Sequence, residues 1–165
     1  GVLELARAFH CLQHSTEFSV DAEESQFTRW SVAILPGSLT SPRLKRELKS
    51  WAMATKQPEA VQLEIVFSDG FPSSVPSVRV VRPRFKWRTG HVTIGGSFCT
   101  ELLTNQGWRE MTVDALLRTV VCMLHDGEAR IQLEPDEHCS RPFADYSCEE
   151  AADAFQRAKA VHGWM

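Results

Sequence analysis

The segment from Val61 to Phe67 most constrains the fold, because an apolar side chain stands at every second position. Gln62 and Glu64 fall between the apolar positions, and a spacing of two is typical of a half-buried β-strand. A turn is predicted at Asp69-Gly70, and a second strand follows from Ser77 to Val81. Strands this close in sequence favour an antiparallel meander.

Five further segments carry regular patterns. Apolar spacing of three and four predicts a helix over residues 2–14, and alternation predicts a strand within residues 27–35. A serine cap followed by proline predicts a helix that begins at Ser41-Pro42. A threonine cap begins a helix over residues 112–126, and a capping box at Ser147 begins a last helix through about Val161. The order of these elements predicts the α+β class.

The 165 residues, 43% of them apolar, suit one domain spanning residues 1–165 with a single core. Eighteen basic against 21 acidic residues give a net charge of −3, which argues against a nucleic-acid partner. No apolar run approaches the roughly 20 residues that span a bilayer, so we expect no membrane partner. Because Gly1 opens the chain, we expect the domain to be excised from a longer protein.

The cysteines are five and widely spaced, an odd number that predicts a reducing compartment and hence a cytoplasmic or nuclear location. Zinc sites need clustered ligands in short paired motifs. His138-Cys139 with Cys148 is the nearest approach and lacks a second pair. We therefore expect no metal site.

An irregular stretch with three glycines runs from Arg82 to Cys99, and such stretches in compact domains are often functional. Cys99 at its end is a candidate nucleophile, because loop thiols near backbone N–H groups can be accessible and activated. The alternative is a small buried apolar residue. His91 suggests a cysteine hydrolase, but no orienting third residue can be assigned.

Basic and aromatic residues alternate in the same region, which is typical of nucleic-acid surfaces. They are Arg79, Arg82, Arg84, Phe85, Lys86, Trp87 and Arg88. The overall charge opposes that function, and a solvated face or a docking surface for an acidic protein is favoured.

An ordered set of motifs resembles the ubiquitin-conjugating enzyme family. The set comprises Phe71-Pro72 with Pro76 after a strand, the segment Gly96–Leu103 around Cys99, and Trp108 before a helix. Further segments are similar to the Q-type subgroup: Val78–Val81, Gly95–Trp108, Gly127–Ile131 and His162–Trp164. The resemblance covers about Phe27 to Ile131.

The resemblance implies a four-stranded antiparallel meander sheet flanked by an N-terminal helix, a central helix after the active-site segment and a C-terminal helix. It also implies that Cys99 forms a thioester with ubiquitin or a ubiquitin-like modifier received from an activating enzyme. The modifier would then pass to a substrate amine, with or without a ubiquitin ligase. No cofactor is implied.

Most of that family has a His-Pro-Asn motif before the cysteine, which this chain lacks, as does the Q-type subgroup. His91 stands eight residues before Cys99, and our hypothesis is that it donates a hydrogen bond in place of the asparagine. We therefore name Cys99 and His91 as the candidate catalytic residues.

Two further departures concern partners. Ser73 and Arg109–Met111 replace apolar contacts that the family offers to ring-type ligases, so we expect weak stimulation by such ligases. The first helix offers only Arg7 and His10 as basic residues, so we expect slow loading by the activating enzyme.

A non-catalytic module on the same fold, binding ubiquitin or a partner protein, is the alternative function. Modules of that kind lack the cysteine, so the presence of Cys99 favours the enzyme.

Overall fold

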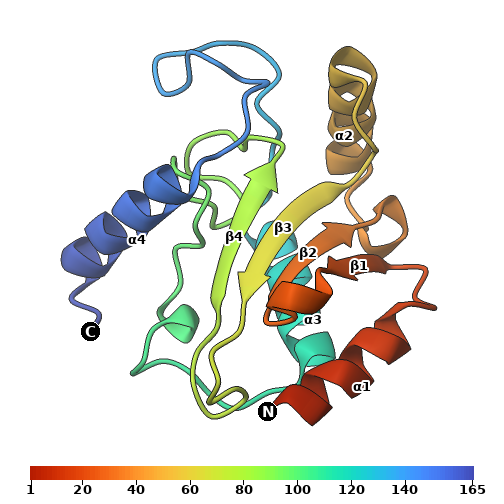
Figure 1. The fold of residues 1–165 in the computed structure, drawn as a ribbon. Helices are drawn as coiled ribbons and strands as arrows, with labels where there is room; N and C mark the ends of the chain where they lie inside the picture. Colours follow the sequence, from red (N-terminus) through yellow and green to blue (C-terminus); the bar gives the residue numbers. More distant parts are fainter.

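The computed structural model describes residues 1–165, and its sheet has four antiparallel strands that follow one another in chain order. The strands are β1 Phe18–Ala22, β2 Arg29–Ile34, β3 Val61–Val66 and β4 Ser77–Arg82. Val32 of β2 lies opposite Leu63 of β3, which in turn lies opposite Val80 of β4. The predicted α+β class and the four-stranded meander are confirmed (Figure 1).

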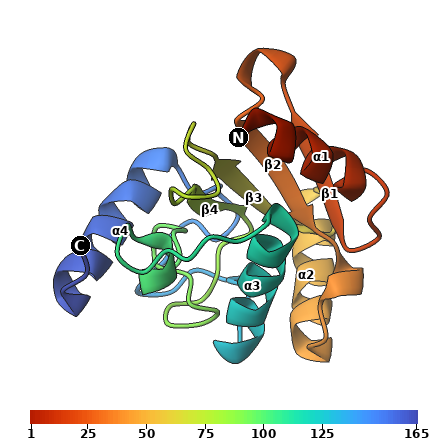
Figure 2. The same cartoon turned by 90° about the horizontal axis from the view of Figure 1, so that it is seen from below.

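Four α-helices surround this sheet. They are α1 Val2–Leu12, α2 Pro42–Thr55, α3 Val113–Asp126 and α4 Cys148–His162, with short 3₁₀ turns at η1 Glu24–Gln26, η2 Pro36–Ser38 and η3 Glu101–Leu103. Figure 1 shows α3 behind the sheet, and both Figure 1 and Figure 2 show α4 on the side of β4. None of the helices is both long and apolar enough to cross a membrane.

The core forms where α3 packs against one face of the sheet. Leu116, Leu117, Val120 and Leu124 of α3 are fully buried, as their three- and four-residue spacing predicts. The alternating apolar positions of β3 are buried as well, while Gln62 and Glu64 between them remain partly exposed. The other face of the sheet therefore stays polar.

The predicted helix starts are confirmed by their capping hydrogen bonds. The hydroxyl of Ser41 accepts from the N–H of Leu44 at 3.2 Å, and that of Thr112 accepts from Ala115 at 3.2 Å. At α4, both arms of the Ser147–Glu150 capping box are present. These caps satisfy N–H groups that have no partner inside a helix.

The structure departs from the sequence patterns at three places. Strand β1 was not among the segments predicted from residue patterns, although Phe18 and Val20 alternate with exposed residues. The first helix ends at Leu12 and not at residue 14. Cys122, next to the apolar stripe of α3, is exposed because it lies just outside the buried arc of that helix.

Glu47, the only acidic residue of α2, joins this helix to the segment after α3. Its carboxylate accepts from the guanidinium of Arg130 at 2.6 Å and from the N–H of Ile131 at 2.8 Å. The Glu47 side chain is 13% exposed, and Ile131 is fully buried. Removal of the carboxylate would therefore leave a backbone N–H without a partner beside the core.

We predict that Glu47→Ala lowers the free energy of unfolding by about 1–3 kcal/mol, because the partners of a buried acceptor are left unsatisfied. Urea denaturation of both proteins measures the change. Arg46→Ala is the control, since Arg46 is exposed and forms no ion pair, and it should cost less than about 0.5 kcal/mol. Equal effects of the two substitutions would contradict this role of Glu47.

Candidate active site

Cys99 lies at the end of the irregular segment, where a tight turn returns the chain to His91. The N–H of Cys99 donates to the carbonyl oxygen of His91 at 2.7 Å. Between these residues, Val92 and Phe98 form an antiparallel bridge, and both are buried. Main-chain hydrogen bonds therefore hold the thiol in position.

His91 approaches Cys99 through its backbone. Its side chain is exposed and forms no hydrogen bond, and its φ of 57° lies in the left-handed region. The structure thus brings the two candidate catalytic residues together, with the carbonyl oxygen of His91 as the contact group. A catalytic function of the His91 imidazole stays a prediction.

The thiol of Cys99 is partly exposed and faces an imidazole that the sequence analysis did not select. Its Sγ lies 3.5 Å from Nε2 of His162. Burial raises the pKa of Cys99 above its usual value, so the thiol is protonated at neutral pH. A thiol in this state needs a neighbouring base to become a nucleophile, and a neutral imidazole can accept its proton.

His162 is the last residue of α4, and the turn after it supports the ring. Gly163 adopts a φ of 69°, which reverses the chain so that the N–H of Trp164 donates to the carbonyl of Lys159 at 3.0 Å. The indole of Trp164 then stacks on the His162 imidazole, with ring centres 4.5 Å apart and planes at 15°. The stack limits the orientations available to the imidazole.

Two glycines let α4 approach the active-site turn closely. A Cβ on Gly95 would overlap the carbonyl of Glu150 and the side chain of Ala154. Gly96 has a φ of 92°, and a Cβ there would overlap the ring of Tyr146. No larger residue fits at either position, so the start of α4 lies directly against the turn that carries Cys99.

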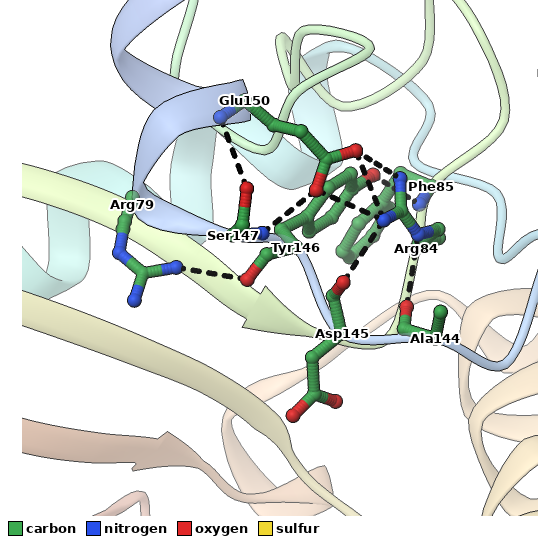
Figure 3. Close-up of polar contacts among 8 residues, drawn as sticks. All are labelled: Arg79, Arg84, Phe85, Ala144, Asp145, Tyr146, Ser147 and Glu150. Atoms are coloured by element: carbon green, nitrogen blue, oxygen red, sulfur yellow. Dashed lines mark hydrogen bonds and ion pairs between the residues drawn. The ribbon is translucent and has the colours of Figure 1, made fainter.

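Arg84 anchors the beginning of α4 through several hydrogen bonds (Figure 3). Its guanidinium donates to the carbonyl oxygens of Ala144 and Asp145, each at 2.9 Å. It also donates to the carboxylate of Glu150 at 3.0 Å. Arg84 thus joins the segment before Cys99 to the first turn of α4.

Tyr146 adds a second, buried anchor beside Arg84. Its hydroxyl accepts from the N–H of Phe85 at 2.8 Å, and its own N–H donates to the carbonyl of Val81 at 2.9 Å. Its carbonyl accepts from Arg79 at 3.1 Å (Figure 3). Burial raises the pKa of Tyr146 to about 12, so its hydroxyl stays neutral.

Glu150 has two partners, since its carboxylate also accepts from the N–H of Ser147 at 2.8 Å. Burial favours the neutral acid, but the hydrogen bonds from Arg84 and Ser147 outweigh burial and lower the pKa of Glu150. The anchor of α4 therefore contributes to stability while Glu150 is ionised, above its ordinary pKa of 4.5. That contribution is lost as the pH falls through the lowered pKa.

We predict that Glu150→Gln weakens the loss of stability on acidification. The wild-type free energy of unfolding should fall between about pH 6 and about pH 3.5, with Glu150 responsible for part of the slope. Glutamine keeps the capping arm but cannot titrate. Urea denaturation at several pH values measures both slopes. Glu149→Gln, at an exposed neighbour without side-chain hydrogen bonds, is the control and should keep the wild-type slope.

Comparison with solved structures places this architecture. A human ubiquitin-conjugating enzyme E2 G1 matches with a TM-score of 0.54 and 19% identity, over 75% of this chain and 93% of that one. A Plasmodium falciparum ubiquitin-conjugating enzyme E2 matches with a TM-score of 0.53 and 16% identity, over 75% and 83%. The fold is therefore that of ubiquitin-conjugating enzymes.

Sequence comparison supports the same assignment. A Drosophila melanogaster Q-like protein of the ubiquitin-conjugating enzymes is 30% identical over 149 residues, which is 90% of this chain. A mouse Q-like ubiquitin-conjugating enzyme protein is 32% identical over 108 residues, 65% of this chain. The chain belongs to the ubiquitin-conjugating enzyme family. It spans 45% of the Drosophila relative and 65% of the mouse one, and no protein-family model matches it.

Ion pairs within this family member occupy most of its basic segment. Arg79 pairs with Glu64 at 2.9 Å, Arg82 pairs with Asp145 at 2.7 Å, and Arg84 binds Glu150 as described above. Hydrogen bonding to Arg82 lowers the pKa of Asp145. Three of the five cations therefore hold the domain together and are not free to bind a nucleic acid.

The region expected to contact ring-type ligases is polar at its surface. Ser73 is exposed, as are Arg109 and Glu110, whereas Met111 packs against the core. The indole N–H of Trp108 donates to the carbonyl of Pro72 at 2.8 Å, which joins the two halves of this surface. The expectation of weak ligase stimulation stays a prediction.

All five cysteines are free, and no group of three or more His, Cys, Asp or Glu side chains is placed to hold a metal ion. The reactive groups that the structure brings together at the site are one thiol and the neighbouring imidazole.

Proposed function

We propose that this domain is a ubiquitin-conjugating enzyme, which accepts ubiquitin as a thioester on Cys99 and transfers it to a substrate amine. The observation that carries the proposal is the partly exposed thiol of Cys99, with Nε2 of His162 at 3.5 Å, on the fold of this family. The Q-like relatives support the assignment.

The first step is an exchange between two thioesters. His162 accepts the thiol proton while Sγ of Cys99 attacks the carbonyl carbon of the incoming thioester. The donor's thiolate leaves as the new S–C bond forms and takes up a proton. The acyl group stays activated throughout, so the step needs no additional energy source.

The second step is attack by an amine. The amine nitrogen bonds to the carbonyl carbon, the S–C bond to Cys99 breaks, and His162 accepts the proton that the amine loses. The main-chain hydrogen bond between Cys99 and His91 holds the thioester in place, which favours a productive approach of the amine.

The partners follow from this chemistry. An activating enzyme supplies the ubiquitin, or a ubiquitin-like modifier, and a protein substrate supplies the amine. A ubiquitin ligase is an optional third partner because the surface at Ser73 is polar. We place the reaction in the cytoplasm or nucleus, where thiols stay reduced.

We predict that the domain forms a thiol-sensitive adduct with ubiquitin in the presence of activating enzyme and ATP. Non-reducing gel electrophoresis shows the adduct, and reductant removes it. Cys99→Ala should form no adduct, and Cys99→Ser should form one that resists reductant, because an ester replaces the thioester. If the folded wild-type domain forms none while a control enzyme loads, the non-catalytic binding module is the better assignment.

We also predict different effects for the two histidines. His162→Ala should slow loading by about ten- to a hundredfold near neutral pH, since a general base is lost. The deficit should shrink as the pH rises, because the thiol then ionises without help. His91→Ala should leave loading intact and slow discharge to lysine. Loading rates measured across pH, with single-turnover discharge, separate the two. Unchanged discharge would refute a catalytic function of His91.

A further inference from the structure

The position of Lys159 relative to Cys99 differs from that of the other lysines. The chain has five lysines, and only Lys159 lies on α4. It is partly buried and has no carboxylate within ion-pair distance. Lys45 and Lys49 lie on α2 and Lys56 ends it, whereas α4 stands on the opposite side of the sheet (Figures 1 and 2).

The helix places Lys159 close to the reacting thiol. Residues three apart on a helix are neighbours on one face, with about 5–6 Å between their Cβ atoms. Lys159 is three residues before His162, whose Nε2 lies 3.5 Å from Sγ of Cys99. The four-carbon stem of lysine is flexible, so its amine can move across this face of the helix.

A groove beside α4 supports the same placement. Cys148, Ala152 and Phe155 line this groove, which has a volume of about 490 Å³. Lys159 continues their spacing by one further turn, so it lies on the groove side of α4. The opposite wall includes Phe98 and Leu103, which flank Cys99 in sequence.

We propose that Lys159 is a site of self-modification, to which the thioester on Cys99 is transferred within one molecule. The inference rests on the proposed function, because it requires the thioester. The neutral amine of Lys159 attacks the thioester carbonyl carbon, an isopeptide bond forms, and the S–C bond to Cys99 breaks. The proton lost by the amine passes to His162 and then to the departing thiolate.

The closing experiment is a single-turnover assay of the domain without added substrate. The domain is loaded with ubiquitin, activating enzyme and ATP, loading is stopped, and the products are separated with and without reductant. We expect a reductant-resistant adduct whose rate of formation does not change with protein concentration, as a reaction within one molecule requires. Peptide mass spectrometry should find the isopeptide bond at Lys159.

Lys159→Arg tests the assignment while it keeps the positive charge. Arginine stays protonated and cannot act as the amine, so the adduct should fall by at least about tenfold while loading is unchanged. Lys86→Arg, at a partly buried lysine in the loop before Cys99, is the matched control and should keep the adduct. A rate that increases with concentration, modification only at other lysines, or decay by hydrolysis alone would overturn the proposal with the thioester intact. If no thioester forms, the proposed function fails as well.

Discussion

The close contact between the Gly95-Gly96 turn and the first turn of α4 is the constraint on which the active site depends. Because neither glycine has a side chain, α4 begins against the turn that carries Cys99. A helix fixed at that point and in that direction brings its last residue, His162, back to the thiol. A side chain at either glycine would move the helix outwards and separate the imidazole from the sulfur.

Polar contacts determine where α4 lies, whereas apolar contacts determine where α3 lies. Only Ala151 and Ala154 of α4 are fully buried, and alanine buries little apolar surface. Arg84, Tyr146 and the capping box supply the remaining contacts. The site therefore combines a thiol on a rigid turn with a base on a helix held by charge and hydrogen bonds.

The protonated state of Cys99 fits a thioester carrier. A thiolate is the form that reacts with oxidants and with unrelated electrophiles, so a raised pKa protects the residue between reactions. The sulfur becomes nucleophilic only when a thioester is positioned against it and His162 accepts the proton. Selectivity then comes from positioning more than from intrinsic reactivity.

Local patterns predicted most of the fold, and the motifs around Cys99 predicted the candidate nucleophile. Strand β1 was not predicted from its residues because it is five residues long and leads into an acidic stretch. His162 was not selected because it is 63 residues from Cys99 in sequence, and only the direction of α4 brings them together. Arg84 was placed on a basic surface, since an ion pair with Glu150 cannot be deduced from spacing.

The contrast between α3 and α4 has a practical consequence for variant screening. A substitution that loosens α4 removes few apolar contacts from the core, so the melting temperature of the domain should change little. The same substitution withdraws the imidazole from the sulfur. A thermal-shift screen would therefore pass inactive variants as intact, and damage to this helix is visible only to an assay that follows the thiol itself.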